Sequence, residues 1–276
     1  EISACLVGSE MCIRDRHGFA AFVAMLRAAL RNAGGVRIDH VMSLSRLWVI
    51  PEGASGAEGA YLRFPFDDLV RLVALESRRH RAIILGEDLG TVPDGFREQL
   101  GQRGIMGLRV LWFERAGERF CPPADWSPAA VGTTSTHDVA TVAGWWRGRD
   151  LEWRRRLDMI GDDQAVWFEF ENRSRDRARL WSAFQASGTA TGGMPAPEEP
   201  GPVVDAAVRH VGGAASGLVM LPLEDALALE EQPNLPGTLH EHPNWRRRLP
   251  RPADRLLDDR TVARRLAELD AARRTG

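Results

Sequence analysis

The chain reads GVRIDHV at residues 35–41 and AIILGED at residues 82–88, and these two stretches decide the fold. Each is a short apolar run that ends in polar, acidic residues. Such runs are typical of strands buried in a parallel sheet. Three further stretches have the same character: GLRVLWF (107–113), VGTTSTHD (131–138) and GLVMLPL (217–223).

Helical patterns lie before and between these strands. The first pattern stops at Gly34 and Gly35 and repeats apolar residues at helical spacing, namely Phe19, Phe22, Val23, Leu26 and Leu30. Further helices are predicted at 66–81, from Pro93 onward, over most of 139–185 and at about 258–274. Residues 187–202 are expected to form a loose Gly/Pro-rich stretch.

The alternation of strands and helices indicates an α/β fold with a parallel sheet. Polar residues follow three of the strands at their carboxyl ends, as in a (β/α)8 barrel of the TIM type, whose site lies at that face. A doubly wound sheet is the alternative. Because only about five strand–helix units can be counted, we predict an incomplete barrel that holds the later βα units.

Composition excludes several classes of function. The 276 residues are 44% hydrophobic and 27% charged, with a net charge of -2, so no strong field favours nucleic acid or anionic lipid. Every basic side chain other than histidine is an arginine. The absence of lysine excludes a lysine Schiff base, and with it pyridoxal-type chemistry.

The sequence also predicts a cytoplasmic protein. Its three cysteines, Cys5, Cys12 and Cys121, form neither a paired framework nor a metal spacing, which favours a reducing compartment. No apolar run approaches the roughly 18 residues of a membrane span, and the N-terminus does not resemble a secretory signal. Residues 1–16 fit no later pattern, so we expect a non-native or disordered leader.

The candidate catalytic acids are Asp39, Glu87 and Asp138, each at the end of a predicted strand. On a barrel they would converge on one cleft, and a pair of carboxylates suits glycosidic bond chemistry. The spacing alone leaves structural roles open. Asp39 could pair with Arg37, Glu87 and Asp88 could form a solvated strand end, and Asp138 could cap a helix.

Longer motifs in a fixed order carry a family resemblance. They are VRIDHVMSLSRLWVIP (36–51), the stretch 59–93 that contains GEDLG, STHDVATVAGWW (135–146), and PNLPGT with PNWRRRL within 233–249. Together they resemble the 4-alpha-glucanotransferases (amylomaltases or disproportionating enzymes) of glycoside hydrolase family 77, in the α-amylase clan. The resemblance implies that residues 17–276 are the C-terminal part of that family's catalytic barrel. Ser43 departs from it, because many relatives carry Gly there.

The resemblance also implies an activity and a set of site residues. The activity is the transfer of a 1,4-α-glucan segment to the 4-hydroxyl of an acceptor glucan or glucose, by a retaining double displacement without a cofactor. Asp39 then corresponds to the nucleophile, Glu87 to the general acid/base and Asp138 to the third acid, which holds sugar hydroxyls. The implied substrate-binding residues are Arg37, His40, His137 and Asn234, and Arg37 is expected to keep Asp39 ionised.

Two geometric expectations follow from this mechanism. The Asp39 and Glu87 carboxyl groups should be ~5–5.5 Å apart, rather than the ~6.5–9.5 Å of inverting enzymes. Transfer also requires an acceptor surface on which a sugar outcompetes water, and Trp48, Tyr61 and Trp245 are candidates for it.

Other motifs have simpler interpretations. Trp145 and Trp146 are expected in the core, whereas Asn234 could be an ordinary turn residue and the histidines ordinary packed side chains. The glycine repeat at 53–59 is not a dinucleotide fingerprint and is expected to be a flexible loop. The arginine clusters are balanced by acids and are expected to be solvated faces rather than nucleic-acid sites. Residues 240–242 (HEH) are too closely spaced for a zinc helix, so no metal site is predicted.

Two alternative functions remain. One is an α-glucan hydrolase of the same clan, and the other is a non-catalytic, incomplete glucan-binding fragment. The low count of βα units supports the second. An open parallel sheet also exposes unpaired strand edges, which favour association. We therefore expect this chain alone to be poorly active and prone to associate.

Overall fold

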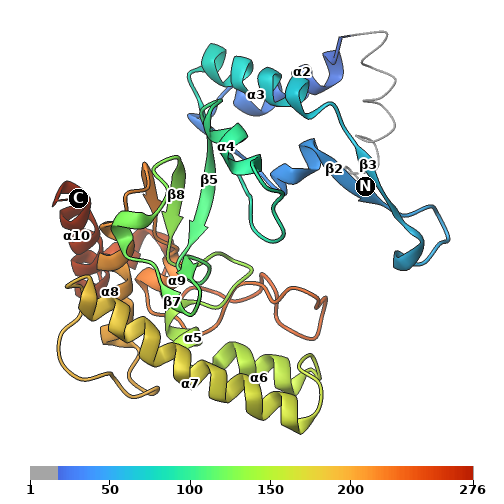
Figure 1. Ribbon diagram of the computed structural model, residues 1–276. Helices are drawn as coiled ribbons and strands as arrows, with labels where there is room; N and C mark the ends of the chain where they lie inside the picture. Colours follow the sequence, from blue (N-terminus) through green and yellow to red (C-terminus); the bar gives the residue numbers. More distant parts are fainter. Residues whose placement is uncertain (1–17, 276) are drawn as a thin grey trace. The chain divides into compact units, whose positions relative to one another are not determined.

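The computed structural model describes residues 18–275, so the predicted leader at 1–16 lies outside the described residues. The chain divides into two compact units, Glu1–Leu108 and Arg109–Gly276. In Figure 1 unit 1 runs from blue to green and unit 2 from green to red. Each unit has its own strands and its own buried residues, and each is described by itself.

Unit 1 is built on parallel strands. The strands β1 (Gly35–Ile38), β4 (Ile83–Gly86) and the start of β5 (Ile105–Val110) are neighbours in that order. The register pairs Ile38 with Gly86. Asp39 and Glu87 therefore follow neighbouring strands at the same edge, which is the edge at which a barrel places its site.

Two helices supply nearly half of the buried core cluster of unit 1. The helices α2 (Ala20–Leu30) and α3 (Phe66–His80) pack side by side (Figure 1). Helix α3 has acids in its first turn and basic residues in its last turn, an order that suits the helix dipole. The buried cluster includes Phe22, Leu26, Leu30, Leu69, Val73, Ile84, Phe96 and Ile105. The predicted helix that stops before Gly34 and the predicted helix at 66–81 are thus confirmed.

A hairpin of unit 1 was not predicted. Strands β2 (Arg46–Val49) and β3 (Ala60–Arg63) pair antiparallel, and between them lies a 3-10 turn, η2 (Gly56–Glu58). Ser55 and Glu58 form a capping box on this turn. The glycine repeat therefore holds a hydrogen-bonded turn, and the flexibility expected of this loop stays a prediction.

Several predicted boundaries were wrong. Strand β1 stops at Ile38 rather than at residue 41, because His40 adopts a left-handed conformation (φ 47°) and η1 (Val41–Leu44) follows it. Helix α4 (Phe96–Gly101) begins at Phe96 rather than at Pro93, because Gly95 takes a left-handed φ of 74°.

Unit 2 contains parallel strands and most of the helices. The strands β8 (Ala130–Thr133) and β9 (Leu218–Met220) pair in parallel, and the Leu111 N–H just after β5 donates to the Thr133 carbonyl at 3.1 Å. A small hairpin joins β6 (Arg115–Ala116) and β7 (Arg119–Phe120). The other elements are η3 (Pro123–Asp125), α5 (Val142–Arg147), α6 (Arg149–Arg156), α7 (Asp163–Ala186), α8 (Gly201–Gly212), α9 (Leu223–Ala226), η4 (Ala253–Asp258) and α10 (Arg260–Thr275).

Tryptophans form much of the core of unit 2. Trp126, Trp145, Trp146 and Trp181 are all buried, and Trp146 is fully enclosed. The prediction that Trp145 and Trp146 belong to the core is confirmed. Helix α8 was not predicted; it begins at Gly201 inside the stretch expected to be loose, with Pro202 in its first turn, where proline is tolerated.

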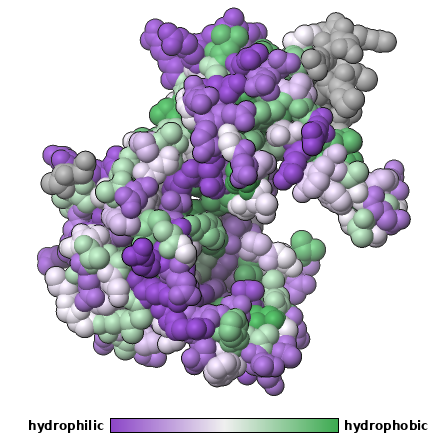
Figure 2. All heavy atoms as spheres, viewed as in Figure 1, coloured by the Kyte–Doolittle hydropathy of each residue, from purple (hydrophilic) through white to green (hydrophobic). Residues whose placement is uncertain are grey.

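The face of the chain seen in Figure 2 carries both polar and apolar side chains. On the face seen in Figure 2, hydrophilic side chains cover much of both units and apolar ones form small patches. Among the described residues, no helix has both the length and the apolar character needed to cross a membrane.

Candidate functional site

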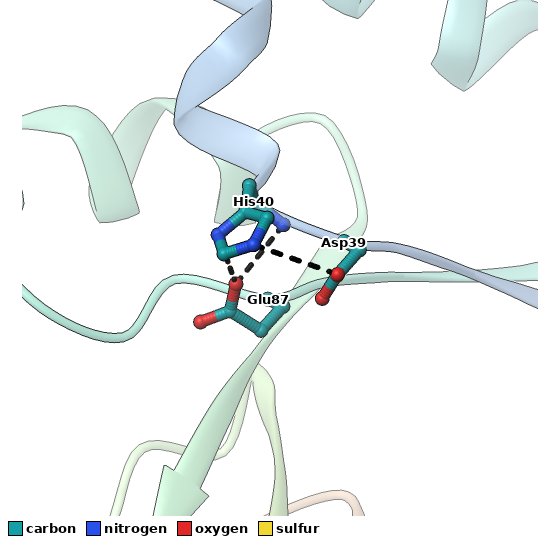
Figure 3. Close-up of side chains that lie close together, drawn as sticks. All are labelled: Asp39, His40 and Glu87. Atoms are coloured by element: carbon teal, nitrogen blue, oxygen red, sulfur yellow. Dashed lines mark hydrogen bonds and ion pairs between the residues drawn. The ribbon is translucent and has the colours of Figure 1, made fainter. Parts of the chain in front are cut away.

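Asp39 and Glu87 lie together in unit 1, with His40 beside both (Figure 3). One side-chain oxygen of each acid and one imidazole nitrogen of His40 lie within 4.8 Å of one another. The His40 Nε2 is 3.6 Å from Asp39 Oδ2, and its Nδ1 is 3.4 Å from Glu87 Oε2. The two strand ends thus bring the first two predicted acids together, as the sequence indicated.

The Glu87 carboxylate is enclosed and held by main-chain groups. Its side chain is 7% exposed, and it accepts hydrogen bonds from the His40 N–H to Oε2 (2.9 Å) and from the Leu89 N–H to Oε1 (2.7 Å). The left-handed turn at His40 directs that N–H at the acid. Each oxygen keeps a further lone pair that can accept another hydrogen bond.

Asp39 has a different environment. Its side chain is 57% exposed, and Arg37 Nη2 lies 2.7 Å from Asp39 Oδ1. The ion pair expected between Arg37 and Asp39 is therefore present. Such an exposed carboxylate is accessible to a substrate, and Arg37 fixes one of its two oxygens.

Asp88 is not part of a solvated strand end, as the structural alternative for Glu87 and Asp88 supposed. It is fully buried, accepts a 2.7 Å hydrogen bond from the Arg97 Nε, and accepts another of 2.7 Å from the Leu108 N–H. Asp88 thus joins the end of β4 to α4 and β5, and fixes the backbone that carries Glu87.

Asp138 lies in unit 2 with the other two predicted binding residues. The Asn234 Nδ2 donates to Asp138 Oδ1 at 2.7 Å, and His137 Nε2 lies 3.1 Å from Asp138 Oδ2. The Asn234 N–H also donates to the His137 carbonyl at 3.1 Å. Asp138 does not cap the following helix, because Thr141 accepts the Gly144 N–H as the cap of α5. Its convergence with Asp39 and Glu87 stays a prediction.

A cavity of about 710 Å³ adjoins this second group. His137 and Trp245 both line it, and their rings lie 5.2 Å apart. Trp245 is 65% exposed, so it offers an accessible aromatic surface beside polar groups. The other residues that line the cavity include Glu230, Glu231, Arg247 and Arg248. A cavity with aromatic and paired charged groups suits a polyhydroxylated ligand.

The pKa of Glu231, which lines this cavity, lies below its ordinary value. Burial by itself raises the pKa of Glu231, but hydrogen bonds from Trp153 and Arg149 and the charge of Arg247 outweigh burial and lower it. The Trp153 Nε1 donates at 2.8 Å and the Arg149 Nε at 2.6 Å. Glu231 is thus an anion held between Arg149 and Arg247, and Arg247 also lines the cavity.

Asp225 anchors the segment that leads to His137 and Asp138. It is fully buried and accepts bonds from the hydroxyls of Ser135 (2.6 Å) and Thr134 (2.5 Å) and from the Val142 N–H (2.7 Å). Burial raises the pKa of Asp225, although these three bonds oppose the shift. Sequence patterns did not identify Asp225, because its partners lie far away along the chain.

The hairpin holds two of the predicted stacking residues. Trp48 and Tyr61 pair across β2 and β3 with ring centroids 5.0 Å apart, and they are 43% and 57% exposed. The Trp48 Nε1 donates to the Gly56 carbonyl at 3.2 Å. Whether a sugar stacks on these rings stays a prediction.

One group in the part of the chain described has the ligand geometry for a metal ion: Asp39, His40 and Glu87. The sequence predicted no metal site there. The same three side chains are those assigned to sugar chemistry, and Glu87 already binds two N–H groups.

Comparison with known proteins agrees with this geometry. Residues 13–254 match the sequence profile of glycoside hydrolase family 77, described as 4-alpha-glucanotransferase. The chain belongs to this family. The 4-alpha-glucanotransferase of Mycobacterium tuberculosis is 38% identical over 264 residues, which is 92% of this chain and 36% of that protein. The Haemophilus influenzae 4-alpha-glucanotransferase is 35% identical over 85% of this chain and 34% of its own length.

Solved structures confirm the fold class. The amylomaltase from Corynebacterium glutamicum matches with a TM-score of 0.81 and 28% identity, over 93% of this chain and 38% of that one. The amylomaltase from Streptococcus agalactiae, solved in complex with acarbose, matches in fold with a TM-score of 0.67 and 15% identity. The predicted α/β fold of the (β/α)8-barrel type with the later βα units present is confirmed. The chain spans between 34% and 44% of the length of these family members.

Proposed function

We propose that this chain carries catalytic residues of a 4-alpha-glucanotransferase, which moves a 1,4-α-glucan segment to the 4-hydroxyl of an acceptor. One observation carries the proposal: Asp39 and Glu87, which follow adjacent parallel strands in a chain of this family, have oxygens within 4.8 Å of each other. An approach this close supports a retaining mechanism, for which we expect the two carboxyl groups to be ~5–5.5 Å apart, against ~6.5–9.5 Å in inverting enzymes.

The environments of the two acids match different roles. The exposed, arginine-paired Asp39 attacks the anomeric carbon and forms a covalent glycosyl–enzyme while Glu87 gives its proton to the glycosidic oxygen. Glu87, now a carboxylate, then takes the proton from the 4-hydroxyl of the acceptor, which attacks the same carbon and releases Asp39. Two inversions give net retention. Asp138, held by Asn234, binds sugar hydroxyls as the third acid.

The substrates that fit this proposal are maltodextrins and glycogen-type 1,4-α-glucans, processed in the cytoplasm. The relatives are 4-alpha-glucanotransferases, and this activity, together with the acarbose complex of the Streptococcus agalactiae amylomaltase, supports the substrate class. His137 and Trp245 on the cavity of unit 2 would contact sugar there.

Incubation with maltotriose tests the activity. Transfer yields longer oligosaccharides together with glucose, whereas hydrolysis by the alternative enzyme yields shorter products only. The assay should use this chain and a version extended upstream, because the chain spans about a third of its relatives. Failure of both forms to convert maltotriose would favour the non-catalytic glucan-binding fragment.

Variants of the two acids test the mechanism. Asp39→Asn should abolish transfer, because the amide cannot act as the nucleophile. Glu87→Gln should accumulate a glycosyl adduct on Asp39 when given an α-glucosyl fluoride, since fluoride leaves without a proton. Mass spectrometry of the acid-quenched protein detects the adduct. An Asp39→Asn variant with parent activity would contradict the assignment.

A further inference from the structure

The segment 232–245 carries Asn234 and Trp245, two groups assigned above to sugar binding. Asn234 donates to Asp138 Oδ1 at 2.7 Å, and the Trp245 N–H donates to the Pro233 carbonyl at 2.9 Å. Trp245 also has a left-handed backbone (φ 58°), which is uncommon for a residue with a large side chain. Interactions within the segment must therefore stabilise the left-handed backbone of Trp245.

Asn244 makes four hydrogen bonds inside the segment. Its Oδ1 accepts the Leu235 N–H at 2.9 Å and lies 2.6 Å from the His242 Nδ1. Its Nδ2 donates to the Thr238 carbonyl at 3.1 Å and to the Thr238 hydroxyl at 2.8 Å. The Thr238 hydroxyl in turn donates to the Leu235 carbonyl at 2.7 Å.

These partners fix which end of the amide is which. A main-chain N–H can bond only to Oδ1, and a carbonyl can bond only to Nδ2. The His242 Nδ1 must therefore carry a proton, because it faces Oδ1. An asparagine amide alone among the side chains of this size supplies two acceptor and two donor bonds in this geometry.

The position of Asn244 links the two sugar-binding groups. Asn244 directly precedes Trp245, and its bond to Leu235 fixes the residue directly after Asn234. We propose that Asn244 is a positioning residue of the catalytic site: it sets Asn234, and through it Asp138, and it sets the Trp245 ring beside His137. This proposal rests on the transferase function proposed above, since that function gives Asp138 its role.

The test replaces Asn244 with Asp. The substitution keeps the size of the side chain but removes the two hydrogen bonds that Nδ2 donates to Thr238. A carboxylate oxygen, which cannot donate, then faces the Thr238 carbonyl. We expect kcat/KM for maltotriose transfer to fall by about 10- to 100-fold, the loss that a displacement of ~1 Å at a catalytic group can cause. Asn172→Asp on α7 is the matched control and should keep the parent kcat/KM. Both are measured in the form of the protein that shows transfer.

A double-mutant cycle with Asn234→Ala separates positioning from a general structural role. If Asn244 acts through Asn234, Asn244→Asp should cost much less kcat/KM in the Asn234→Ala background than in the parent. Equal cost in both backgrounds, or an Asn244→Asp enzyme with parent kcat/KM, would overturn the proposal.

Amide hydrogen exchange gives a readout that needs no activity. The Leu235 and Trp245 amides should be protected in the parent and exchange faster in Asn244→Asp. Unchanged protection at both amides would overturn the positioning role whether or not the parent is active. A parent that protects both amides but transfers no sugar would instead overturn the proposed function, and with it the link to catalysis.

Discussion

Gly86 is the last residue of β4 and directly precedes Glu87, the proposed general acid/base. A Cβ atom placed on Gly86 would lie 2.9 Å from Val41 Cγ2, 3.0 Å from Cγ1 and 3.1 Å from Cβ. Val41 is fully buried, and its N–H donates to the Glu87 carbonyl at 3.0 Å. Gly86→Ala must therefore push Val41, and with it the neighbouring His40, away from Glu87.

The size of the effect follows from these contacts. Real Cβ atoms almost never approach other carbons this closely, so Val41 must move by several tenths of an ångström within a close-packed core. Overpacking of this kind costs about 1–3 kcal/mol of the free energy of unfolding. Transfer activity should fall as well, because the His40 N–H, which donates to Glu87 Oε2, moves with Val41.

A double-mutant cycle measured by urea unfolding tests this reasoning. Val41→Ala makes room for the new methyl group, so Gly86→Ala should cost less in the Val41→Ala background than alone, with a coupling energy of about 0.5–3 kcal/mol. Gly34→Ala is the matched control, because a Cβ there meets nothing within 4 Å, and it should be close to neutral. Additive single effects, or a Gly86→Ala protein as stable as the parent, would refute the argument.

Two further predictions concern pH. Burial lowers the pKa of His210 to about 4, although the hydrogen bond from its Nε2 to the Cys121 carbonyl acts in the opposite direction. Between pH 6.5 and about 4, His210 therefore binds a proton in the unfolded chain but not in the folded one. The free energy of unfolding should thus fall by roughly 3 kcal/mol as the pH drops through this window. In His210→Gln, urea unfolding at a series of pH values should show a smaller fall, and an equal fall in parent and variant would contradict this. Glu231 has a lowered pKa, because hydrogen bonds from Trp153 and arginine outweigh burial, so its stabilising contribution is present above its unfolded pKa and lost as the pH falls through its folded pKa. Glu231→Gln should therefore be less stable than the parent at pH 7 and closer to it below about pH 4.5, as calorimetry at both pH values would show; an equal deficit at both would refute it.

The sequence was informative where the signal is local. Apolar spacing located α2 and α3, and the strand runs that end in acids located β1 and β4 with Asp39 and Glu87 behind them. Burial of one face of a helix or of both faces of a strand leaves such a period in the chain itself. The same reasoning missed α8 and the β2–β3 hairpin, because Gly and Pro obscured the period of the first and the second is a short, largely exposed ribbon.

What the sequence by itself determined is the family, the alternation of the parallel strands with helices, and the identity of the acids at two neighbouring strand ends. Only the tertiary structure decided what holds them: the His40 N–H meets Glu87 across 47 residues of chain, and Asp225 meets Ser135 across 90. A hydrogen bond depends on two groups being within about 3 Å in space. No local pattern records that distance, because the fold brings the partners together only after the chain has turned back on itself.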